Sequence, residues 1–586
     1  MRFPLWLLAL AGCRGCKHED TAGFCPDGEP QTFYQDADGD GFGDPDAPED
    51  ACETGNGLVA DNTDCDDDND TRAALVSAYV DGDGDGFGTG AAQTICEGEP
   101  GFATVAEDCD DDDANINPAR EPVCENSQDD DCDGLSDCET PTGQADIDDS
   151  TYTRSRIYGY GALGTAVLGA GDLNGDGWPD IAVGAPSAGD GGEVYVWYGP
   201  LDDLEASDAA DLTFYAEGGS IEAGGSLGAG DLDGDGVRDL VIGAPGGSVA
   251  DGGRAVYLVH GAMAEDAPLT DSPVVDIIGR SGGEGVATDV DFRGSDGVVD
   301  LLIGSGGSLI FIQGPITEST DDYRDIYDGY LQGDSASGTG EAVIFAGDVN
   351  ADGDPDIVLG NPSATCALEG EDGARGGNNG CAFLYTEPAQ LREDDATVAD
   401  VYDRVLLGEA TGDRLSHALA PAGDVDGDGY ADVLIGAPGT DARATDGGTV
   451  YLLSGADWWA LGDKGRLGAE DISARIDGDE EGMALGSALA GNLNLDGDDV
   501  PDFAVGSPGA DDGKGAVLVW YGSLQDTAKA SDAGWRVNGA KAGDGLGTSL
   551  SDAGDMNGAG LDDLLVGAPA ADGGAGAVWL LTTDGW

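Results

Sequence analysis

The segment DLNGDGWPD at residues 172–180 alternates acidic or amide side chains with glycines and apolar residues. Asp172, Asn174 and Asp176 occupy positions 1, 3 and 5 of this nine-residue loop, Trp178 at position 7 would offer its carbonyl, and Asp180 closes the loop. All of these donors are oxygens, which suits a hard cation such as Ca²⁺. Mg²⁺ is less suitable, because it favours a tight octahedron and keeps several waters. The spacing therefore predicts a calcium site.

The same loop recurs at one position of a longer repeat. The predicted ligands in the four other loops that keep the carboxylate spacing are Asp231, Asp233, Asp235, Val237, Asp239; Asp348, Asn350, Asp352, Asp354, Asp356; Asp424, Asp426, Asp428, Tyr430, Asp432; and Asn494, Asp496, Asp498, Val500, Asp502. An ordinary turn is the alternative for any one loop, because Asp, Asn and Gly are common turn residues. Repetition at a fixed place in the repeat favours metal binding, with about four or five Ca²⁺ ions expected.

Two further copies of the loop are degenerate. The copy near 291–300 has a broken spacing, and the copy at 555–563 has Ala559 at the fifth position. In the 494–502 copy, Asp499 replaces the glycine at the sixth position. Whether the two degenerate loops hold metal stays open.

The elements around each loop predict an all-β repeat. Each loop is followed by a short apolar run such as IAVGAP (181–186), an alternating strand such as EVYVWYG (193–199) and a further strand. Seven such four-stranded units predict a seven-bladed β-propeller over residues 141–586. The last unit lacks a fourth strand, so the segment near 150–159 is expected to join the last blade and close the ring.

Residues 31–140 form a second region with similar loops and few apolar residues. The predicted ligands there are Asp36, Asp38, Asp40, Asp44; Asp81, Asp83, Asp85; and Asp129, Asp131, Asp133, Asp137. Because so few apolar side chains cannot build a core, disulfides and additional Ca²⁺ ions must stabilise any fold. The alternative is a disordered acidic spacer.

Twelve cysteines indicate disulfides in an exported chain. Nine lie between residues 16 and 138, whereas Cys366 and Cys381 stand alone and are expected to pair. Local pairs Cys52–Cys65, Cys96–Cys109 and Cys124–Cys132 are one interpretation, with the connectivity and the unpaired cysteine left open.

The first 13 residues have the charge and apolar pattern of a secretory signal. Leu10-Ala11-Gly12-Cys13 resembles the lipobox of bacterial lipoproteins, which implies lipidation of Cys13 and a linker over 14–30. The resemblance implies an outer-membrane or cell-surface location, with a periplasmic or fully secreted protein as alternatives.

The charge balance excludes two classes of partner. The chain has 24 basic and 117 acidic residues, a formal net charge of −93. Nucleic acids and anionic membrane surfaces would be repelled, so any membrane contact is expected only through the lipid anchor.

Two resemblances follow from these motifs. The Asp loop followed by GAP, with Leu-Gly ahead as at Leu163-Gly164, resembles the FG-GAP repeat of the integrin α-subunit propeller. It implies Ca²⁺ loops on one face of the propeller and partner recognition on the other. The N-terminal loops resemble thrombospondin type 3 repeats and a Cys-containing metal-binding motif of bacterial surface proteins.

No catalytic arrangement stands out. The three histidines, His18, His260 and His417, form no pair or metalloprotease motif, and we predict no enzyme. The predicted function is calcium-dependent adhesion to, or binding of, an extracellular protein or polysaccharide, with the oligomeric state open. A secreted hydrolase with an unrecognised site and a metal-storage or scavenging protein are the alternatives.

Overall fold

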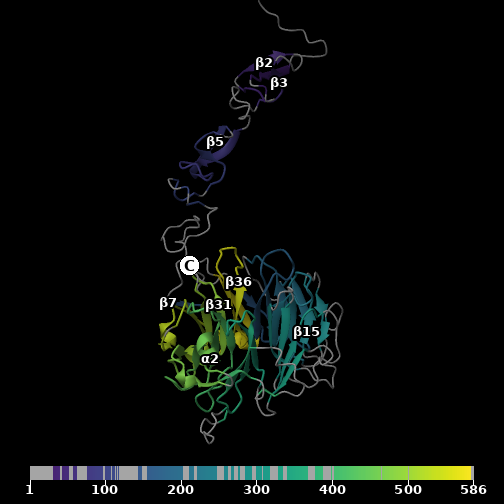
Figure 1. Cartoon of the computed structure of the whole chain (residues 1–586). Coiled ribbons are helices and arrows are strands. Elements are labelled where there is room, and N and C mark those ends of the chain that lie inside the picture. Colours follow the sequence, from purple (N-terminus) through teal and green to yellow (C-terminus); the bar gives the residue numbers. More distant parts are fainter. Residues whose placement is uncertain are drawn as a thin grey trace, which may run out of the picture. The chain divides into compact units, whose positions relative to one another are not determined.

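The computed structural model describes most of residues 31–117 and 143–582 (Figure 1). Outside the described residues lie 1–30, 38, 40–41, 46, 52–56, 63–74, 97–98, 107, 112–113, 115, 118–142, 148–154, 202–209, 217–220, 247–255, 262–265, 270–274, 278–283, 293–298, 306–307, 317–327, 334–338, 367–376, 387–396, 399–401, 463–464, 499, 525 and 583–586. The chain divides into two compact units: residues 1–123 with 127–137, and residues 124–126 with 138–586. Among the described helices, none has the length and apolar character needed to span a bilayer.

The described part of the second unit contains seven sheets, sheet 1 to sheet 7, each with four antiparallel strands. Sheet 1 consists of β9 (Ala166–Gly171), β10 (Asp180–Ala185), β11 (Glu193–Trp197) and β12 (Leu212–Tyr215). Sheet 2 consists of β13 (Ser226–Gly230), β14 (Asp239–Gly243), β15 (Val256–Val259) and β17 (Val275–Ile277). Sheet 3 consists of β18 (Glu284–Phe292), β19 (Val299–Ser305), β20 (Ser308–Ile312) and β21 (Gly329–Gln332). Sheet 4 consists of β22 (Ala342–Gly347), β23 (Asp356–Asn361), β24 (Cys381–Tyr385) and β25 (Arg404–Leu407). Sheet 5 consists of β26 (Leu419–Gly423), β27 (Asp432–Ala437), β28 (Thr449–Leu453) and β30 (Arg475–Asp477). Sheet 6 consists of β31 (Ala488–Leu493), β32 (Asp502–Ser507), β33 (Ala516–Trp520) and β35 (Trp535–Asn538). Sheet 7 is β36 (Ser549–Gly554), β37 (Asp563–Ala568), β38 (Ala577–Leu581) and β8 (Ser155–Tyr158).

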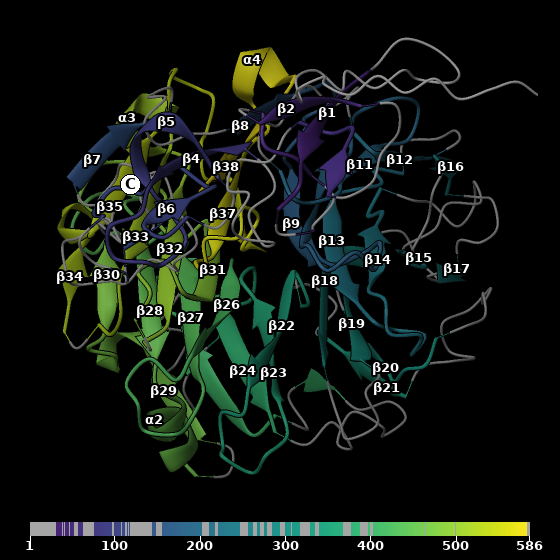
Figure 2. The ribbon, with the colours of Figure 1, turned by 90° about the horizontal axis from the view of Figure 1, so that it is seen from above.

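The strand expected to join the last repeat does so. β8 pairs antiparallel with β38, with Arg156 opposite Trp579 and Ile157 opposite Val578. The first strands contact one another in sequence order, β9 to β13, β18, β22, β26, β31 and β36, and β36 returns to β9. Figure 2 shows these sheets arranged around a common centre. This all-β arrangement is consistent with a β-propeller.

Four sheets have one strand more than the sequence predicted. β16 (Ala267–Pro268), β29 (Gly465–Gly468), β34 (Ala528–Lys529) and β7 (Gly143–Asp146) pair in parallel with β12, β25, β30 and β35. The expectation of four strands in every sheet was therefore wrong for these sheets. The reason is that a short strand added to an open sheet edge needs only free backbone groups, and so carries no apolar alternation to detect.

The core of this unit lies between neighbouring sheets. Seven buried clusters each join two consecutive sheets, and the last joins sheet 7 to sheet 1 through side chains such as Ile157, Val578 and Ile181. Second strands such as β10 are buried along their whole length, because another sheet covers each face. A side chain at Gly184 would clash with the carbonyl of Gly224, so the glycine of the GAP motif permits this close approach.

Short helical segments lie outside the sheets. They are α2 (Gly455–Ala460), α3 (Ala510–Gly513), α4 (Ala571–Gly574), η5 (Ala469–Asp471) and η6 (Ala530–Asp532). In α2, Trp458 is fully buried, and Trp459 lies under the guanidinium of Arg404, whose carbon is 4.2 Å from the ring centre. Both rings therefore help to anchor α2 to the sheets.

The first unit contains two three-stranded sheets in its described part. One consists of β1 (Gln31–Gln35), β2 (Pro48–Ala51) and β3 (Leu58–Val59), and the other of β4 (Leu75–Val80), β5 (Thr89–Cys96) and β6 (Phe102–Ala103). Among its described residues, the buried apolar side chains are Phe33, Ala78, Ala103 and Ile116. So small a core agrees with the expectation that other bonds must stabilise this region, and Cys96 and Cys109 are both in disulfides.

Candidate metal sites

In the second unit, the Asp loops connect the first strand of a sheet to its second strand. In sheet 1, β9 ends at Gly171 and β10 begins at Asp180, which places positions 1 to 8 of the loop between the strands and the closing carboxylate on β10. The same placement holds in sheets 2, 4, 5, 6 and 7. In sheet 3 the central loop residues 293–298 lie outside the described residues, but Asp300 occupies the closing position and is buried.

Within each loop, side-chain oxygens accept backbone N–H groups in a fixed pattern. Asp172 accepts bonds from Gly175, Asp176 and Gly177 over 2.6–3.1 Å. The side chains at the third and fifth positions each accept a hydrogen bond from the backbone N–H two residues later. Asn174 Oδ1 accepts the N–H of Asp176 at 2.8 Å, and Asp176 Oδ1 accepts the N–H of Trp178 at 2.9 Å. Loops 231–239, 348–356, 424–432 and 494–502 follow the pattern with few omissions.

The sixth-position glycine is required by backbone conformation. Gly177, Gly236, Gly353 and Gly429 have φ between +92° and +97°, and nothing lies within 4 Å of a Cβ placed on any of them. The constraint is therefore conformational and not steric, because an L side chain is strained at such φ. Asp499, which replaces this glycine in sheet 6, lies outside the described residues.

The closing aspartate joins three segments of its sheet. Asp180 is fully buried, one of its oxygens accepts the N–H of Leu173 at 2.7 Å, and the other accepts the N–H of Gly199 after the third strand at 2.9 Å. Asp239, Asp432 and Asp502 repeat both bonds with the equivalent residues. The loop, the second strand and the end of the third strand thus meet at one carboxylate.

Burial raises the pKa of these closing carboxyl groups. Desolvation is the main cause, and neighbouring loop carboxylates add to it, whereas backbone hydrogen bonds oppose it. The pKa is about 6 for Asp180 and Asp432, about 7 for Asp502 and about 8 for Asp356. A cation among the oxygens would offset this cost and hold the groups ionised.

The side-chain oxygens of these loops form donor sets that fit a divalent cation. Carboxylate oxygens of Asp231, Asp233 and Asp235, and of Asp424, Asp426 and Asp432, lie within 4.8 Å of one another. Asn350 Oδ1, at the third position of its loop, is buried and makes no hydrogen bond. A buried acceptor without a donor, beside several carboxylates, is what a bound cation would satisfy.

Backbone hydrogen bonds link the loops of sheets 1 and 2, of sheets 4 and 5, and of sheets 6 and 7. In each case the backbone N–H at position 8 of one loop donates to the backbone carbonyl at position 1 of the preceding loop. Arg238 donates to Asp172 at 3.3 Å, and Ala431 donates to Asp348 at 2.9 Å. Asp562 to Asn494 follows the same pattern at 2.8 Å. These backbone bonds hold each pair of loops side by side.

In the first unit, one predicted loop is described in full. Asp81, Asp83 and Asp85 form a cluster, and Asp83 Oδ2 is buried without a hydrogen bond. Asp111 accepts the N–H of Gly82 at 2.8 Å, and Asp108 is buried near the same cluster with its pKa raised by burial and by the carboxylates of Asp85, Asp83 and Asp111.

Two acidic residues at this site were missed in the sequence. Asp108 and Asp111 were not assigned as ligands, although the acidic run DCDDDD at 108–113 was the available signal. Of the other predicted N-terminal ligands, Asp36 accepts the N–H of Gly39 at 2.6 Å and Asp44 begins a turn after β1. Asp38, Asp40, Asp129, Asp131, Asp133, Asp137 and Cys13 lie outside the described residues.

The predicted disulfide between Cys366 and Cys381 is present, with an S–S distance of 2.06 Å. It ties the connection after β23 to the start of β24. Asn379 beside it is fully buried and bonds to both backbone groups of Cys366 and to the carbonyl of Gly408. The intervening residues 367–376 lie outside the described residues.

A pocket of about 390 Å³ lies beside the loop of sheet 5. Asp426 and Asp432 of the loop, Asp457 of α2 and Asp471 of η5 line it together with apolar side chains such as Leu461 and Leu467. The combination of carboxylates and apolar walls would suit a ligand that is cationic or reaches the loop through a bound metal.

The FG-GAP repeat family matches five segments of the chain: residues 163–197, 223–259, 339–379, 417–453 and 547–581. These segments contain the loops of sheets 1, 2, 4, 5 and 7. The chain therefore carries FG-GAP repeats, as the sequence motifs indicated.

Curated relatives match about a third of the chain. Integrin alpha-7 of Mus musculus is 37% identical over 186 residues, which cover 31% of this chain and 14% of the relative. Integrin alpha pat-2 of Caenorhabditis briggsae is 31% identical over 183 residues (30% and 14%), and phosphatidylinositol-glycan-specific phospholipase D of Bos taurus is 35% identical over 175 residues (28% and 19%). The chain spans less than a fifth of these relatives. Over about a third of its length the chain is therefore similar to integrin alpha chains and to this phospholipase D.

Proposed function

We propose that the chain is an exported, lipid-anchored calcium-binding protein that binds an extracellular protein or polysaccharide. In this proposal the seven sheets are the blades of a β-propeller closed by β8, and four or five of its loops hold Ca²⁺. The observation that carries the proposal is the shared loop geometry: the hydrogen bonds fix the carboxylates close together and leave ligand oxygens such as Asn350 Oδ1 without donors.

The chain's own residues prepare these sites. The first-position carboxylate orders the loop through backbone N–H groups, and the buried closing aspartate connects the loop to the second and third strands. Bound Ca²⁺ would supply positive charge that lowers the repulsion among the carboxylates. The expected role of the metal is structural, with recognition carried by other surfaces.

Two surfaces support a binding role. The connection closed by Cys366–Cys381 is tied at both ends to sheet 4, and long loops on rigid scaffolds often carry recognition. The pocket beside the sheet 5 loop combines carboxylates with apolar walls. We propose that Cys13 anchors the chain at an outer membrane or cell surface and that the loops of residues 31–140, which resemble thrombospondin type 3 repeats, bind further Ca²⁺. The proposal assigns no reaction to the chain.

Calcium removal from the full chain tests the proposal. Because Ca²⁺ would bind the folded state alone, it should raise the midpoint of thermal unfolding, and metal analysis should find at least four bound ions. The variant Asp428→Asn, which keeps an oxygen acceptor for the N–H of Tyr430 but loses the charge, should bind one ion fewer. Glycan and matrix-protein arrays, probed with Ca²⁺ and after its removal, then test recognition. Unchanged melting and no bound Ca²⁺ would reject the calcium sites, whereas calcium binding with no captured ligand in either array would reject the adhesion role.

A further inference from the structure

The loop of sheet 2 has a histidine beside its carboxylates, which the loops of sheets 1, 5 and 6 lack. His260 follows β15, and its Nδ1 lies 3.0 Å from Asp233 Oδ2 and 3.4 Å from Asp239 Oδ1. Nδ1 is buried at ion-pairing distance from both carboxylates but is not aligned for a hydrogen bond with either, and Asp239 is fully buried. These three side chains place ligand atoms within 4.8 Å of one another.

We propose that Asp233, Asp239 and His260 bind a transition-metal dication of the Zn²⁺ class instead of Ca²⁺. Imidazole is a ligand for Zn²⁺, Ni²⁺ and Cu²⁺, whereas Ca²⁺ takes oxygen donors. Ligand atoms bonded to Zn²⁺ at about 2.0–2.1 Å lie roughly 2.9–3.4 Å apart in octahedral or tetrahedral geometry. The two distances from His260 fall at this spacing.

The other sheets provide an internal comparison. In sheets 1, 2, 5 and 6, the glycine after the third strand donates its N–H to the closing aspartate, so the preceding residues are equivalent. That residue is Tyr198 in sheet 1, Ser454 in sheet 5 and Tyr521 in sheet 6. Ser454 hydrogen-bonds to the third-position Asp426, just as His260 approaches the third-position Asp233. The position therefore faces the loop in sheets 2 and 5, and among these four sheets only sheet 2 has an imidazole there.

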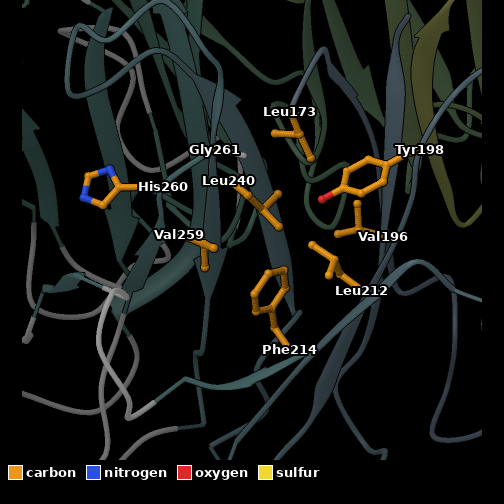
Figure 3. A pocket seen from close by; sticks show the side chains of 9 residues that line it. All are labelled: Leu173, Val196, Tyr198, Leu212, Phe214, Leu240, Val259, His260 and Gly261. Atoms are coloured by element: carbon orange, nitrogen blue, oxygen red, sulfur yellow. The ribbon is translucent and has the colours of Figure 1, made fainter. Parts of the chain in front are cut away.

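The surroundings hold the cluster in place. Asp239 accepts the N–H groups of Leu232 and Gly261, and Asp233 Oδ1 accepts that of Asp235, which leaves Asp233 Oδ2 for a metal. The cavity behind His260 has a volume of only about 10 Å³, room for one water at most. Figure 3 shows the imidazole pointing away from its apolar lining, which includes Phe214 and Val259.

Zinc binding to the full chain in excess Ca²⁺ tests this proposal. Because Ca²⁺ fills the oxygen-only sites, equilibrium dialysis against low Zn²⁺ should show one Zn²⁺ ion more for the wild type than for His260→Ser. The affinity at this site should fall by more than the roughly 10- to 100-fold that loss of an outer-shell partner costs. His417→Asn is the matched control, because His417 lies beside Arg414 outside the loops, and it should retain the ion. Ser454→His should add one zinc ion at sheet 5.

A spectroscopic measurement identifies the ligand. Cu²⁺ loaded in place of Zn²⁺ should show imidazole nitrogen in its electron spin echo modulation, and His260→Ser should remove that signal. Equal zinc binding by the wild type and His260→Ser would overturn the proposal, as would Ca²⁺ filling this loop in the wild type while Zn²⁺ is excluded. The calcium count at the other loops is read in the same samples, so failure of the zinc site and failure of the calcium sites are distinguishable.

Discussion

Asn557 and Ala559 show what one carboxylate contributes to a loop. In loops 172–180 and 348–356, the third-position asparagine donates Nδ2–H to the fifth-position aspartate at 2.9 Å. In loop 555–563 the fifth residue is Ala559, and Asn557 Nδ2 is buried without a hydrogen bond. The backbone pattern is nevertheless kept, because Asp555 still accepts the N–H groups of Gly558, Ala559 and Gly560.

The variant Ala559→Asp should therefore restore a metal site. The new carboxylate would face Asn557 on a scaffold that already has the required shape, so we expect one additional Ca²⁺ ion per chain and a stability gain of about 1 kcal/mol from the hydrogen bond, increased further by Ca²⁺. Metal analysis and melting with and without Ca²⁺ measure both effects. Ala559→Asn, which adds an acceptor without charge, is the matched control and should not gain the ion. An unchanged ion count in Ala559→Asp would show that loop shape does not determine binding.

At the scale of the loop and its strands, the buried closing aspartates predict an unusual pH dependence. Their pKa values of about 6 to 8 in the folded chain lie above the ordinary value of 3.8. The folded state therefore holds these protons more tightly than the unfolded state. Their contribution to stability is complete below pH 4 and is lost as the pH rises through about 6 to 8.

Metal-free protein should consequently be less stable at pH 8 than at pH 5. Ca²⁺ should reverse this order, because it binds the ionised carboxylates that form at higher pH. Thermal melts of dialysed protein between pH 5 and 8, with and without Ca²⁺, check the prediction. Asp356→Asn removes the group with the highest of these pKa values and should flatten the metal-free profile between pH 6 and 8. A metal-free profile that rises toward pH 8 would contradict the assignment.

The sequence predicted these elements unevenly, for physical reasons. The loops and second strands were predictable because Asp and Gly spacing and fully buried apolar runs are local signals, as at Asp180 and β10. The parallel strands β16, β29, β34 and β7 were not, since pairing at a sheet edge uses backbone groups alone. His260 was not assigned as a metal ligand, because its approach to Asp233 joins residues 27 positions apart. Asp108 and Asp111 likewise reach Asp81–Asp85 only through the fold.

At the scale of the whole second unit, stability depends on how its two ends meet. Each consecutive pair of sheets shares a buried cluster, and the cluster between sheets 7 and 1 includes Ile157 of β8. β8 precedes sheet 1 in the sequence but pairs with β38 near the end of the chain. The pairing joins segments more than 400 residues apart, so its formation carries a large loop-closure cost that specific contacts must offset.

Arg156 provides such a contact. Its guanidinium carbon lies 4.8 Å from the centre of the Trp579 ring, and it forms an ion pair with Asp572 at 3.2 Å. We expect Arg156→Ala to lower the free energy of unfolding by about 1–2 kcal/mol, because a partly desolvated cation–π contact and an ion pair are lost together.

Lys541→Ala is the matched control. Lys541 also pairs with Asp572, at 2.8 Å, but its side chain is 63% exposed and it makes no ring contact among the described residues. Its loss should cost clearly less than the loss of Arg156, because exposed ion pairs contribute little to stability. Urea unfolding of the two variants beside the wild type measures the difference. Arg156→Lys, which keeps the charge but not the planar group, should fall between Arg156→Ala and the wild type. If Arg156→Ala and Lys541→Ala cost the same, the ring contact with Trp579 does not secure the closing strand, and the closure depends on backbone pairing and the apolar cluster alone.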